Sequence, residues 1–202
     1  MNCEVYWLGL VGYDDAWRMQ EEWAVEIADG VRPNTLLFLE HPPTYTLGRR
    51  GDARHVLWTD AARAERGVNL RWVDRGGDVT YHGPGQLVGY PLLRLAGANW
   101  QQERLPQADF VGYVRRLEEV LIAALANFGV QAEARPGLTG VWVGKDKIAS
   151  IGVKVDARGI SRHGFALNVN VDKQYWGGIV PCGLDGGKMN NLADFLLLVP
   201  PI

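Results

Sequence analysis

Residues 147–171 carry the sequence KIASIGVKVDARGISRHGFALNVNV, which decides the class of fold. Apolar and polar side chains alternate along residues 147–155, and this alternation is typical of a strand. The turn-forming group Asp-Ala-Arg-Gly follows at 156–159, and residues 160–171 form a second strand-like run. We therefore expect a β-hairpin here and a β-sheet at the centre of the protein.

Further strands and helices are expected on both sides of this hairpin. The apolar pattern predicts strands at 4–11, 35–40, 68–73 and 140–143, and helices at 14–29, 60–66 and 107–128. Strands interspersed with a few helices predict a mixed β-sheet with helices packed against it. We expect one domain, residues 1–202, of either the α/β or the α+β class.

The composition is that of an ordinary globular protein and excludes several classes of function. The 202 residues are 47% hydrophobic and 22% charged, which suffices to fill a core. A formal net charge of −2 gives no overall positive field, so we expect no nucleic-acid partner. A signal-peptide pattern, a membrane-spanning run and a disulfide scaffold are all missing from the sequence. We therefore expect a cytoplasmic protein with no membrane partner.

Glycine is unusually frequent and is concentrated in two segments. Of the 25 glycines, five lie in residues 75–90 and eleven in residues 137–187. The first segment contains RGGDVTYHGPGQ at 75–86, where paired glycines would let a ligand approach the backbone N–H groups. A tight turn that holds a structural His82 is the other interpretation. The segment has neither a dinucleotide fingerprint nor a Walker loop.

Cys182, in the sequence VPCGL, is a candidate nucleophile. A thiol reacts as the thiolate, so it needs a neighbouring base or cation. The candidates are His82, His163 and the lysines at 145, 147 and 154. A buried, unreactive cysteine is the other interpretation. Cys3, beside the N-terminus, is expected to have no role in catalysis.

Lys147 opens the first strand of the hairpin. Strict alternation would place it on the same face as Ala149 and Ile151. If that face is interior, the lysine is buried, and burial lets a lysine exchange a proton with a thiol. A solvated lysine at the end of a strand is the other interpretation.

Together these segments resemble the octanoyltransferases of lipoate biosynthesis, which are relatives of the biotin and lipoate protein ligases. The resemblance extends in order over residues 35–184. It is carried by EHPPTYTLGRR (40–50), RGGDVTYHGPGQLVGYPL (75–92), KIASIGVKV (147–155), HGFALNVNVD (163–172) and PCGL (181–184).

The resemblance implies both a fold and an activity. The fold would be α+β, a mixed β-sheet with packed helices, as in the catalytic domain of the biotin and lipoate protein ligases. The activity would transfer an octanoyl or lipoyl group from acyl carrier protein to a lysine amine, as the first step of endogenous protein lipoylation. The donor would be octanoyl-acyl carrier protein, and the acceptors would be lipoyl domains of 2-oxoacid dehydrogenase complexes and the glycine cleavage H protein. Neither a cofactor nor a metal is expected.

The resemblance also assigns residues to roles. Cys182 corresponds to the catalytic nucleophile, which forms a thioester acyl-enzyme, and Lys147 to its catalytic partner. The substrate-binding positions correspond to Arg75, Gly76, Gly77, Asp78, Val79, Thr80, Tyr81, His82, Ser150, Ile151, Gly152, His163, Gly164 and Phe165. The chain departs from the family at 189–192, where MNNL stands in place of the usual Thr-Ser-Leu turn. Asparagine can cap a turn as threonine or serine does.

Three other functions are open at this point. An ATP-dependent lipoate or biotin ligase would require ATP and a free acid. A non-catalytic binding module on the same fold would not need Cys182. A cysteine–histidine hydrolase would use His82 or His163 as its base, and Lys147 would then matter little.

A locally basic stretch suggests how an acidic carrier would dock. Residues 41–75 contain seven arginines against four acidic residues, a local charge of +3. Arg49, Arg50 and Arg54 are the candidates for this contact, and scattered solvated arginines are the alternative.

Overall fold

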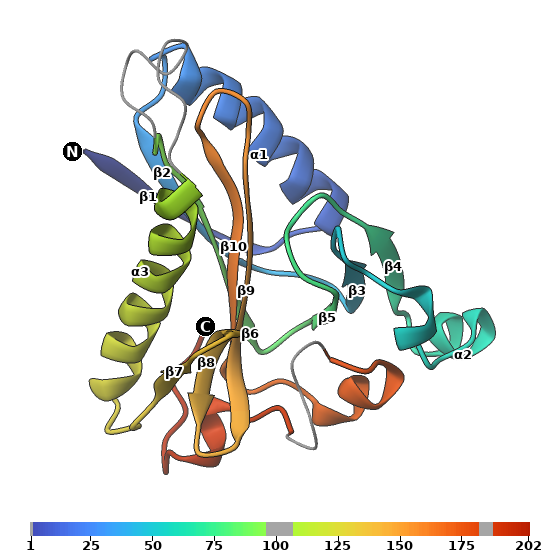
Figure 1. Cartoon of the computed structure of the whole chain (residues 1–202). Coiled ribbons are helices and arrows are strands. Elements are labelled where there is room, and N and C mark those ends of the chain that lie inside the picture. The colour runs from blue at the N-terminus through green and yellow to red at the C-terminus, as the bar shows by residue number, and fades with distance from the viewer. Residues whose placement is uncertain (1, 96–106, 182–187) are drawn as a thin grey trace.

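The computed structural model describes residues 2–95, 107–181 and 188–202. Within these ranges the structure has two β-sheets, whereas the sequence predicted one (Figure 1). The larger sheet contains, in spatial order, β1 (Cys3–Leu10), β2 (Asn34–Glu40), β6 (Gln86–Leu92), β10 (Ser161–Asn168), β9 (Asp146–Val155), β8 (Leu138–Val143) and β7 (Glu133–Arg135). β1 and β2 are parallel, and the other pairs are antiparallel, so the sheet is mixed as expected.

The predicted hairpin is confirmed as the pair β9–β10. Its register runs from Ser161 opposite Val155 to Leu167 opposite Ala149. β10 is buried along its whole length because β6 and β9 flank it and helices lie over both of its faces. β10 is therefore the central strand of the larger sheet.

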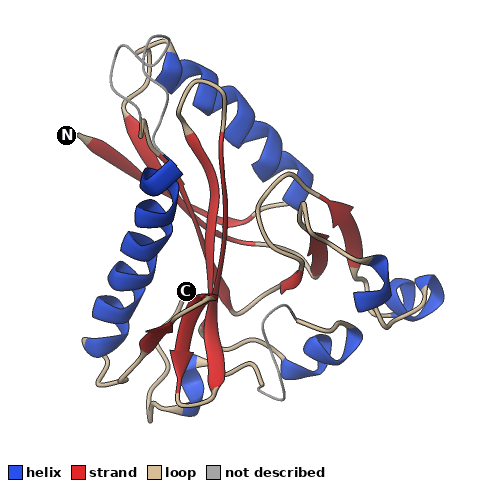
Figure 2. Cartoon of the chain, in the orientation of Figure 1, coloured by secondary structure: helices blue, strands red, loops and turns tan. Residues whose placement is uncertain are grey.

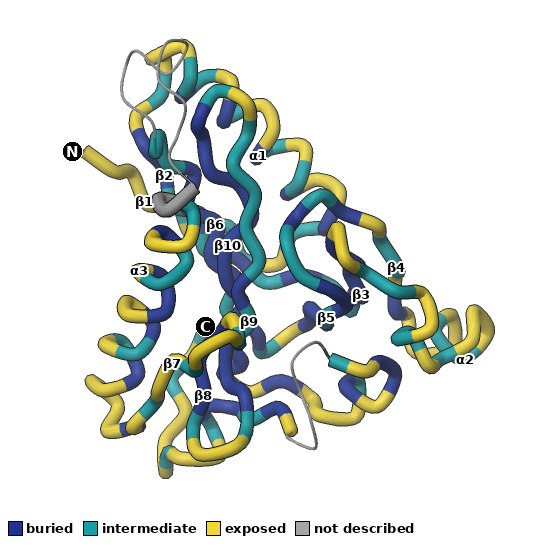
Figure 3. The backbone as a smooth tube through the Cα atoms, in the orientation of Figure 1, coloured by how far each residue is buried: buried dark blue, intermediate teal, exposed yellow. Residues whose placement is uncertain are grey.

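Helices α1 (Tyr13–Ala28) and α3 (Gln107–Ala126) cover opposite faces of the larger sheet (Figures 1 and 2). Beneath α1, the core cluster includes Leu37, Val88 and Ala166. Beneath α3, another cluster includes Phe165 and Leu167, the neighbours of Ala166 along β10. Because successive side chains of a strand point to opposite faces, the two helices bury the central strand β10 on both sides, whereas the edge strand β1 is largely exposed (Figure 3).

The smaller sheet contains β4 (Asn69–Trp72), β3 (Thr44–Leu47) and β5 (Val79–His82). β3 was not predicted because it is only four residues long and all four of its side chains are buried, so it shows no alternation. β5 and β6 were also missed, because the glycines and Pro84 of residues 75–86 suggested a turn throughout. The irregular backbone is limited to the loop at 74–78 and the turn at 83–85, and β5 lies between them.

The remaining elements are short. Thr59 caps helix α2 (Asp60–Glu65) by accepting from the Ala62 N–H, as its position before the helix predicted. Three 3₁₀ turns complete the fold, at η1 (Ala53–His55), η2 (Lys173–Gly178) and η3 (Leu192–Asp194). None of the helices in the described ranges is long and apolar enough to span a membrane.

The start of η3 agrees with the expectation that an asparagine caps this turn, because Asn191 is its N-cap residue and forms a capping box with Asp194. The Asn191 side chain donates to the Val171 carbonyl, and the carboxylate of Asp194 accepts from the Asn191 N–H. Aspartate therefore stabilises the turn, and asparagine ties it to the chain that follows β10.

The strict alternation predicted for β9 is wrong at Ile148. One step along β8, from Val141 to Trp142, corresponds to two steps along β9, from Ala149 to Lys147. Ile148 is therefore the extra residue of a β-bulge, and both Ile148 and Ala149 belong to the core cluster beneath α3. The bulge separates Lys147 from the face that carries Ala149 and Ile151.

Two buried histidines join the sheets. His41 follows β2, His82 ends β5, and their ring centroids are 5.7 Å apart. The carbonyl of Val11 accepts from His41 Nδ1 over 2.8 Å, so Nε2 accepts from the Tyr90 hydroxyl over 2.7 Å. Burial lowers the pKa of His41 to about 4, so this imidazole is neutral at physiological pH.

This geometry predicts a pH-dependent stability with a defined sign. Between pH 6.5 and about 4 the unfolded chain binds a proton on His41 that the folded chain does not. The free energy of unfolding therefore falls as the pH falls through this window. One such proton contributes a slope of about 1.4 kcal/mol per pH unit. In H41Q, urea unfolding between pH 4 and 7 is expected to give a lower stability at pH 7 and a shallower slope. An unchanged slope would contradict this account.

Candidate active site

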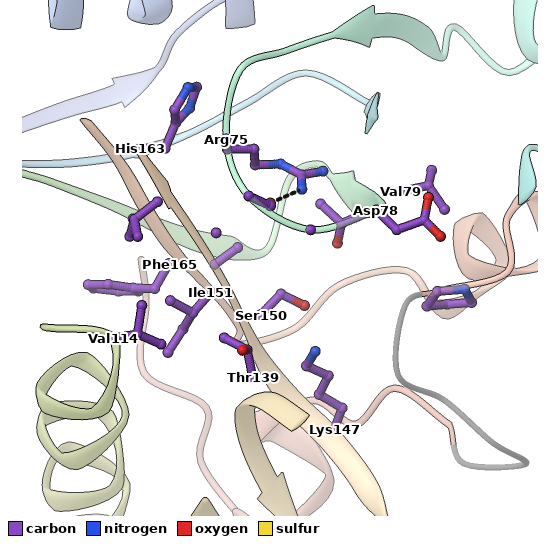
Figure 4. A pocket seen from close by; sticks show the side chains of 18 of the residues that line it. Arg75, Asp78, Val79, Val114, Thr139, Lys147, Ser150, Ile151, His163 and Phe165 are labelled. Carbon is purple, nitrogen blue, oxygen red and sulfur yellow. Dashed lines mark hydrogen bonds between the residues drawn. The ribbon is translucent and has the colours of Figure 1, made fainter. Parts of the chain in front are cut away.

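A cavity of about 250 Å³ lies between the smaller sheet, the β9–β10 hairpin and α3 (Figure 4). Its walls include Phe165, which belongs to the cluster beneath α3, and Ala166, which belongs to the cluster beneath α1. A cavity can reach both faces because β8 pairs with β9 only from Asp146 to Ala149. Beyond Ala149 the edge of β9 is free of β8, and the residues that follow, Ser150 to Val153, line the cavity.

Residues 75–78 form one wall, held by backbone contacts on two sides. The Gly76 N–H donates to the Val153 carbonyl of β9 over 3.0 Å, and the Arg49 N–H donates to the Arg75 carbonyl over 2.9 Å. A Cβ at Gly152 would lie 2.9 Å from the Gly76 oxygen, and one at Gly48 would lie 2.5 Å from the Gly77 oxygen. The glycines on the two flanking segments are therefore needed so that this loop can lie between them.

Arg75 lies inside this wall rather than on the surface. Its guanidinium donates to the carbonyl and the hydroxyl of Thr46 on β3 and to the Gly76 carbonyl. The side chain is 7% exposed and lines the cavity. Arg75 therefore fixes the loop to the smaller sheet and contributes positive charge to the cavity.

Asp74 anchors the beginning of the same loop. Its carboxylate accepts from His163 Nε2 over 2.7 Å, from Arg162 over 2.8 Å and from Lys154 over 2.5 Å. Burial alone would raise the pKa of Asp74, but the hydrogen bonds from His163 and Lys154 and the charge of Arg162 hold it well below its ordinary value. All three donors come from the β9–β10 hairpin, so Asp74 fastens the glycine loop to the central strands.

His163 is held by this contact in an unusual backbone conformation. Its φ is 56°, in the left-handed region, and its N–H donates to the buried Gln20 side chain of α1 over 2.7 Å. Burial lowers the pKa of His163, and the hydrogen bond to Asp74 opposes this. In Figure 4 the His163 ring points away from Ser150 and Lys147. Its main contribution is therefore to orient the loop through Asp74.

Lys147 is buried at the cavity wall, which excludes the solvated alternative. It is 7% exposed, and its Nζ lies 5.4 Å from the centroid of the Trp142 ring. The aliphatic part of the Lys147 side chain occupies the space beside Gly140, because a Cβ built on Gly140 would lie 2.3 Å from Lys147 Cε. Gly140 has φ 127°, so both its conformation and its missing side chain make room for the lysine.

Cys182 and residues 183–187 lie outside the described residues, but both ends of this segment are fixed at the site. Pro181, which is bonded to Cys182, lines the cavity, and the Val180 N–H donates to the His55 carbonyl over 2.8 Å. At the other end, the Lys147 N–H donates to the Lys188 carbonyl, and the Asn190 N–H donates to the Lys147 carbonyl. The segment that contains Cys182 therefore starts at the cavity and ends beside Lys147.

The structure brings nearly all of the sequence-predicted binding positions to this one cavity. Its lining includes Arg75, Gly76, Gly77, Asp78, Val79, Thr80, His82, Lys147, Ser150, Ile151, Gly152, His163, Gly164 and Phe165. Tyr81 lies elsewhere, because alternation along β5 turns its ring into a different core cluster. That ring stacks on Tyr175 at 5.0 Å with an interplanar angle of 7°.

His82 lines the cavity and is structural as well, so the two interpretations of its segment are compatible. Its Nδ1 contacts Gln86 at 2.8 Å and its Nε2 contacts Thr46 at 3.3 Å. Burial, together with the neighbouring His41 and Arg75, holds the pKa of His82 well below its ordinary value. A neutral ring with both nitrogens engaged connects β5, β6 and β3.

Sequence reasoning missed several other residues of the wall. Tyr13, Tyr90, Val114 and Thr139 line the cavity from elements far apart in the sequence. Asp74 stands two residues before the glycine pair, next to Arg75, and that position was the one available signal of its role. The others occupy ordinary helix and strand positions, so no local pattern distinguishes them.

Most arginines of the basic stretch are paired or buried in the structure. Arg54, Arg63, Arg66 and Arg71 form ion pairs with acidic side chains, and Arg75 is buried. Arg49 and Arg50 are exposed, and Arg50 lines the cavity. Of the three arginines suggested for docking, Arg54 is therefore already neutralised by Asp52, whereas Arg50 stands at the site itself.

The comparison with known proteins agrees with this geometry. Residues 12–201 match the family model of the lipoyl protein ligase A/B catalytic domain. An octanoyltransferase of Gloeobacter violaceus is 51% identical over 184 residues, which are 91% of this chain and 77% of that protein. One from Chloroflexus aggregans is 46% identical over 200 residues, 98% of this chain and 87% of that protein. The chain therefore belongs to the lipoyl protein ligase A/B catalytic domain family and, within it, to the octanoyltransferases, which are acyltransferases.

Solved structures show the same fold at much lower sequence identity. Lipoate-protein ligase A bound with ATP superposes with a TM-score of 0.74 at 16% identity, over 98% of this chain and 79% of that one. The bipartite lipoate protein ligase of Thermoplasma acidophilum gives 0.66 at 17% identity, over 98% and 78%. The α+β fold with a mixed sheet, expected from the resemblance, is thereby confirmed.

The Asp74 contacts lead to a prediction about stability. D74N removes the charge that three donors share, two of them from the buried Arg162 and His163, and is expected to lower the free energy of unfolding at pH 7 by about 3 kcal/mol. Because the pKa of Asp74 is lowered on folding, its stabilisation is complete above the ordinary value of 3.8 and is lost as the pH falls below that value. Chemical unfolding at pH 7 and at pH 3 measures both effects.

A matched control uses a second aspartate–arginine pair that is exposed. Asp14 binds Arg71 at 2.8 Å, with side chains 53% and 39% exposed. D14N is expected to change stability by less than about 1 kcal/mol, because water screens an exposed pair. Equal effects of D74N and D14N would show that Asp74 does not anchor the loop.

Proposed function

We propose that this protein transfers an octanoyl group from octanoyl-acyl carrier protein to a lysine amine of a lipoyl domain, through a thioester on Cys182. The observation that carries this proposal is the buried amine of Lys147 on the cavity wall. The backbone of Lys147 is hydrogen-bonded to Lys188 and Asn190, which follow the Cys182 segment in the chain. A buried cation beside a thiol favours the thiolate. The identity with curated octanoyltransferases supports the same reaction.

The first half of the reaction forms the acyl-enzyme. The Cys182 thiolate attacks the carbonyl carbon of the donor thioester, a new C–S bond forms, and the bond to the carrier thiol breaks. Lys147 stabilises the thiolate before the attack and supplies the proton that the departing thiolate takes. One thioester replaces another, so the step needs no ATP. Backbone N–H groups of the glycine-rich loop would stabilise the oxyanion of the tetrahedral intermediate.

The second half forms an amide. The acceptor lysine amine attacks the acyl-enzyme carbonyl, a C–N bond forms, and the bond to Cys182 breaks. The proton lost by the amine passes to Lys147, which by then has given up its own, and the lysine is ready for another cycle. The acceptors in this proposal are the lipoyl domains of 2-oxoacid dehydrogenase complexes and the glycine cleavage H protein.

The arrangement of the histidines argues against a cysteine–histidine hydrolase. Both nitrogens of His82 are engaged by neighbouring side chains, and His163 donates to Asp74. The backbone of Lys147 is hydrogen-bonded to Lys188 and Asn190, which follow the Cys182 segment. The shared fold does not separate the transferase from an ATP-dependent ligase, so the test below includes ATP.

The decisive experiment is intact-mass spectrometry of the protein incubated with octanoyl-acyl carrier protein. The wild-type chain is expected to gain one octanoyl group, which peptide mapping places on Cys182, and to pass it to a lipoyl domain without ATP. C182A is expected to gain none, whereas C3A, which alters the exposed second cysteine, keeps both reactions. An adduct on Cys3 alone, or transfer that requires ATP and free octanoate, would refute the proposal.

A second pair of variants tests the partner of the thiol. K147A is expected to lower kcat by about 100-fold or more, the range for loss of a positioned acid–base group. K145A, two residues away in the exposed turn before β9, is the matched control and should retain activity. A mild effect of K147A with a severe effect of H82A would favour the hydrolase mechanism instead.

A further inference from the structure

The part of the cavity that faces α3 is apolar. Val114, Ile151 and Phe165 lie together there, on the opposite side of the β9–β10 hairpin from Arg75 and Asp78 (Figure 4). Ile151 and Phe165 are 8% and 9% exposed, and both belong to the core cluster beneath α3. The apolar surroundings that a hydrocarbon chain needs are therefore found at this end of the cavity, past the part of β9 that pairs with β8.

Phe165 belongs to a row of residues that crosses the sheet. Phe38 on β2 is opposite Gly89 on β6, Gly89 is opposite Phe165 on β10, and Phe165 is opposite Ile151 on β9. Residues that are directly opposite point to the same face, so the whole row faces α3. Gly89 is the one member of these four without a side chain.

The missing side chain of Gly89 is where the Phe165 ring lies. A Cβ at Gly89 would be 2.2 Å from Phe165 Cζ and 2.5 Å from Cε1. On the far side of Gly89, Phe38 packs against the same ring with centroids 6.4 Å apart. The ring thus leans away from Ile151 and over β6, and its position determines how much of the apolar space is open.

We propose that Phe165, seated over Gly89, closes the apolar end of the cavity and sets the length of the acyl chain that is transferred. This inference rests on the proposed acyl transfer. Removing the ring extends the cavity toward β6 and accommodates longer chains. Filling the space over Gly89 displaces the ring toward Ile151, because Phe38 occupies the other side, and the cavity then accepts shorter chains.

The test is a competition among donors in the full-length protein. Equimolar hexanoyl-, octanoyl-, decanoyl- and dodecanoyl-acyl carrier protein are offered with a lipoyl domain, and mass spectrometry measures the ratio of products. Each buried methylene changes affinity about fourfold. F165A is therefore expected to raise the decanoyl-to-octanoyl ratio about 15-fold, and G89A to raise the hexanoyl-to-octanoyl ratio by a similar factor.

Two further variants separate this effect from general loosening of the core. F165L keeps more of the core volume than F165A and should shift the ratio in the same direction by less. The double variant G89A/F165L places a smaller side chain beside the added methyl group and should return the ratio toward that of the wild type. L167A, in the same cluster on the same face of β10 but outside the cavity lining, should leave the ratio unchanged.

The outcomes distinguish a failure of the chain-length inference from a failure of the proposed function. If the wild-type protein transfers acyl groups but F165A and G89A keep its product ratio, or L167A shifts it as much as F165A, then Phe165 does not set the chain length. If the wild-type protein transfers no acyl group of any length, the proposed function fails and this inference fails with it.

Discussion

The contact on which the site depends is the close approach of the loop at 75–78 to the backbones on either side of it. Gly48 and Gly152 make this approach possible, because a Cβ at either position would lie less than 3 Å from a loop carbonyl. Asp74 then fastens the loop to the hairpin through Arg162 and His163. The cavity exists because these contacts hold the loop against the central strands, so loop and strands form one wall.

The β9 strand divides the cavity into a polar and an apolar side, and irregularities in that strand connect them. The bulge at Ile148 turns Lys147 away from the α3 cluster, in which Ile148 and Ala149 are both buried. Beyond Ala149 the strand is no longer paired with β8, and the next backbone contact on that edge is the bond from Gly76 to Val153. One cavity can therefore hold both the charged amine of Lys147 and a hydrocarbon chain beneath α3. The bulge at Ile148 and the end of the β8 pairing keep the amine and the hydrocarbon on opposite faces of β9.

Much of the fold and of the site could be predicted from the sequence, for physical reasons that differ. The β9–β10 hairpin follows from alternation and a turn, and α3 follows from its apolar spacing. The segment 75–82 stood out by its paired glycines, and the resemblance to the octanoyltransferases assigned its residues to substrate binding. β3 was not predicted, and Tyr81 was expected at the substrate site although its ring lies in another core cluster. Both errors arise because the burial of a short strand and the face that a side chain occupies depend on distant partners.

The sequence by itself determined the β9–β10 hairpin, the helices and the chemical types at the site, since periodicity, turn residues, one cysteine and one lysine are all local properties. The tertiary structure alone decided that Lys147 is buried, that Asp74 anchors the glycine loop and that Phe165 leans over Gly89. Each of these depends on contact between segments at least 70 residues apart or on a one-residue shift of register. Such contacts arise from packing in three dimensions, and no pattern within a single segment records them.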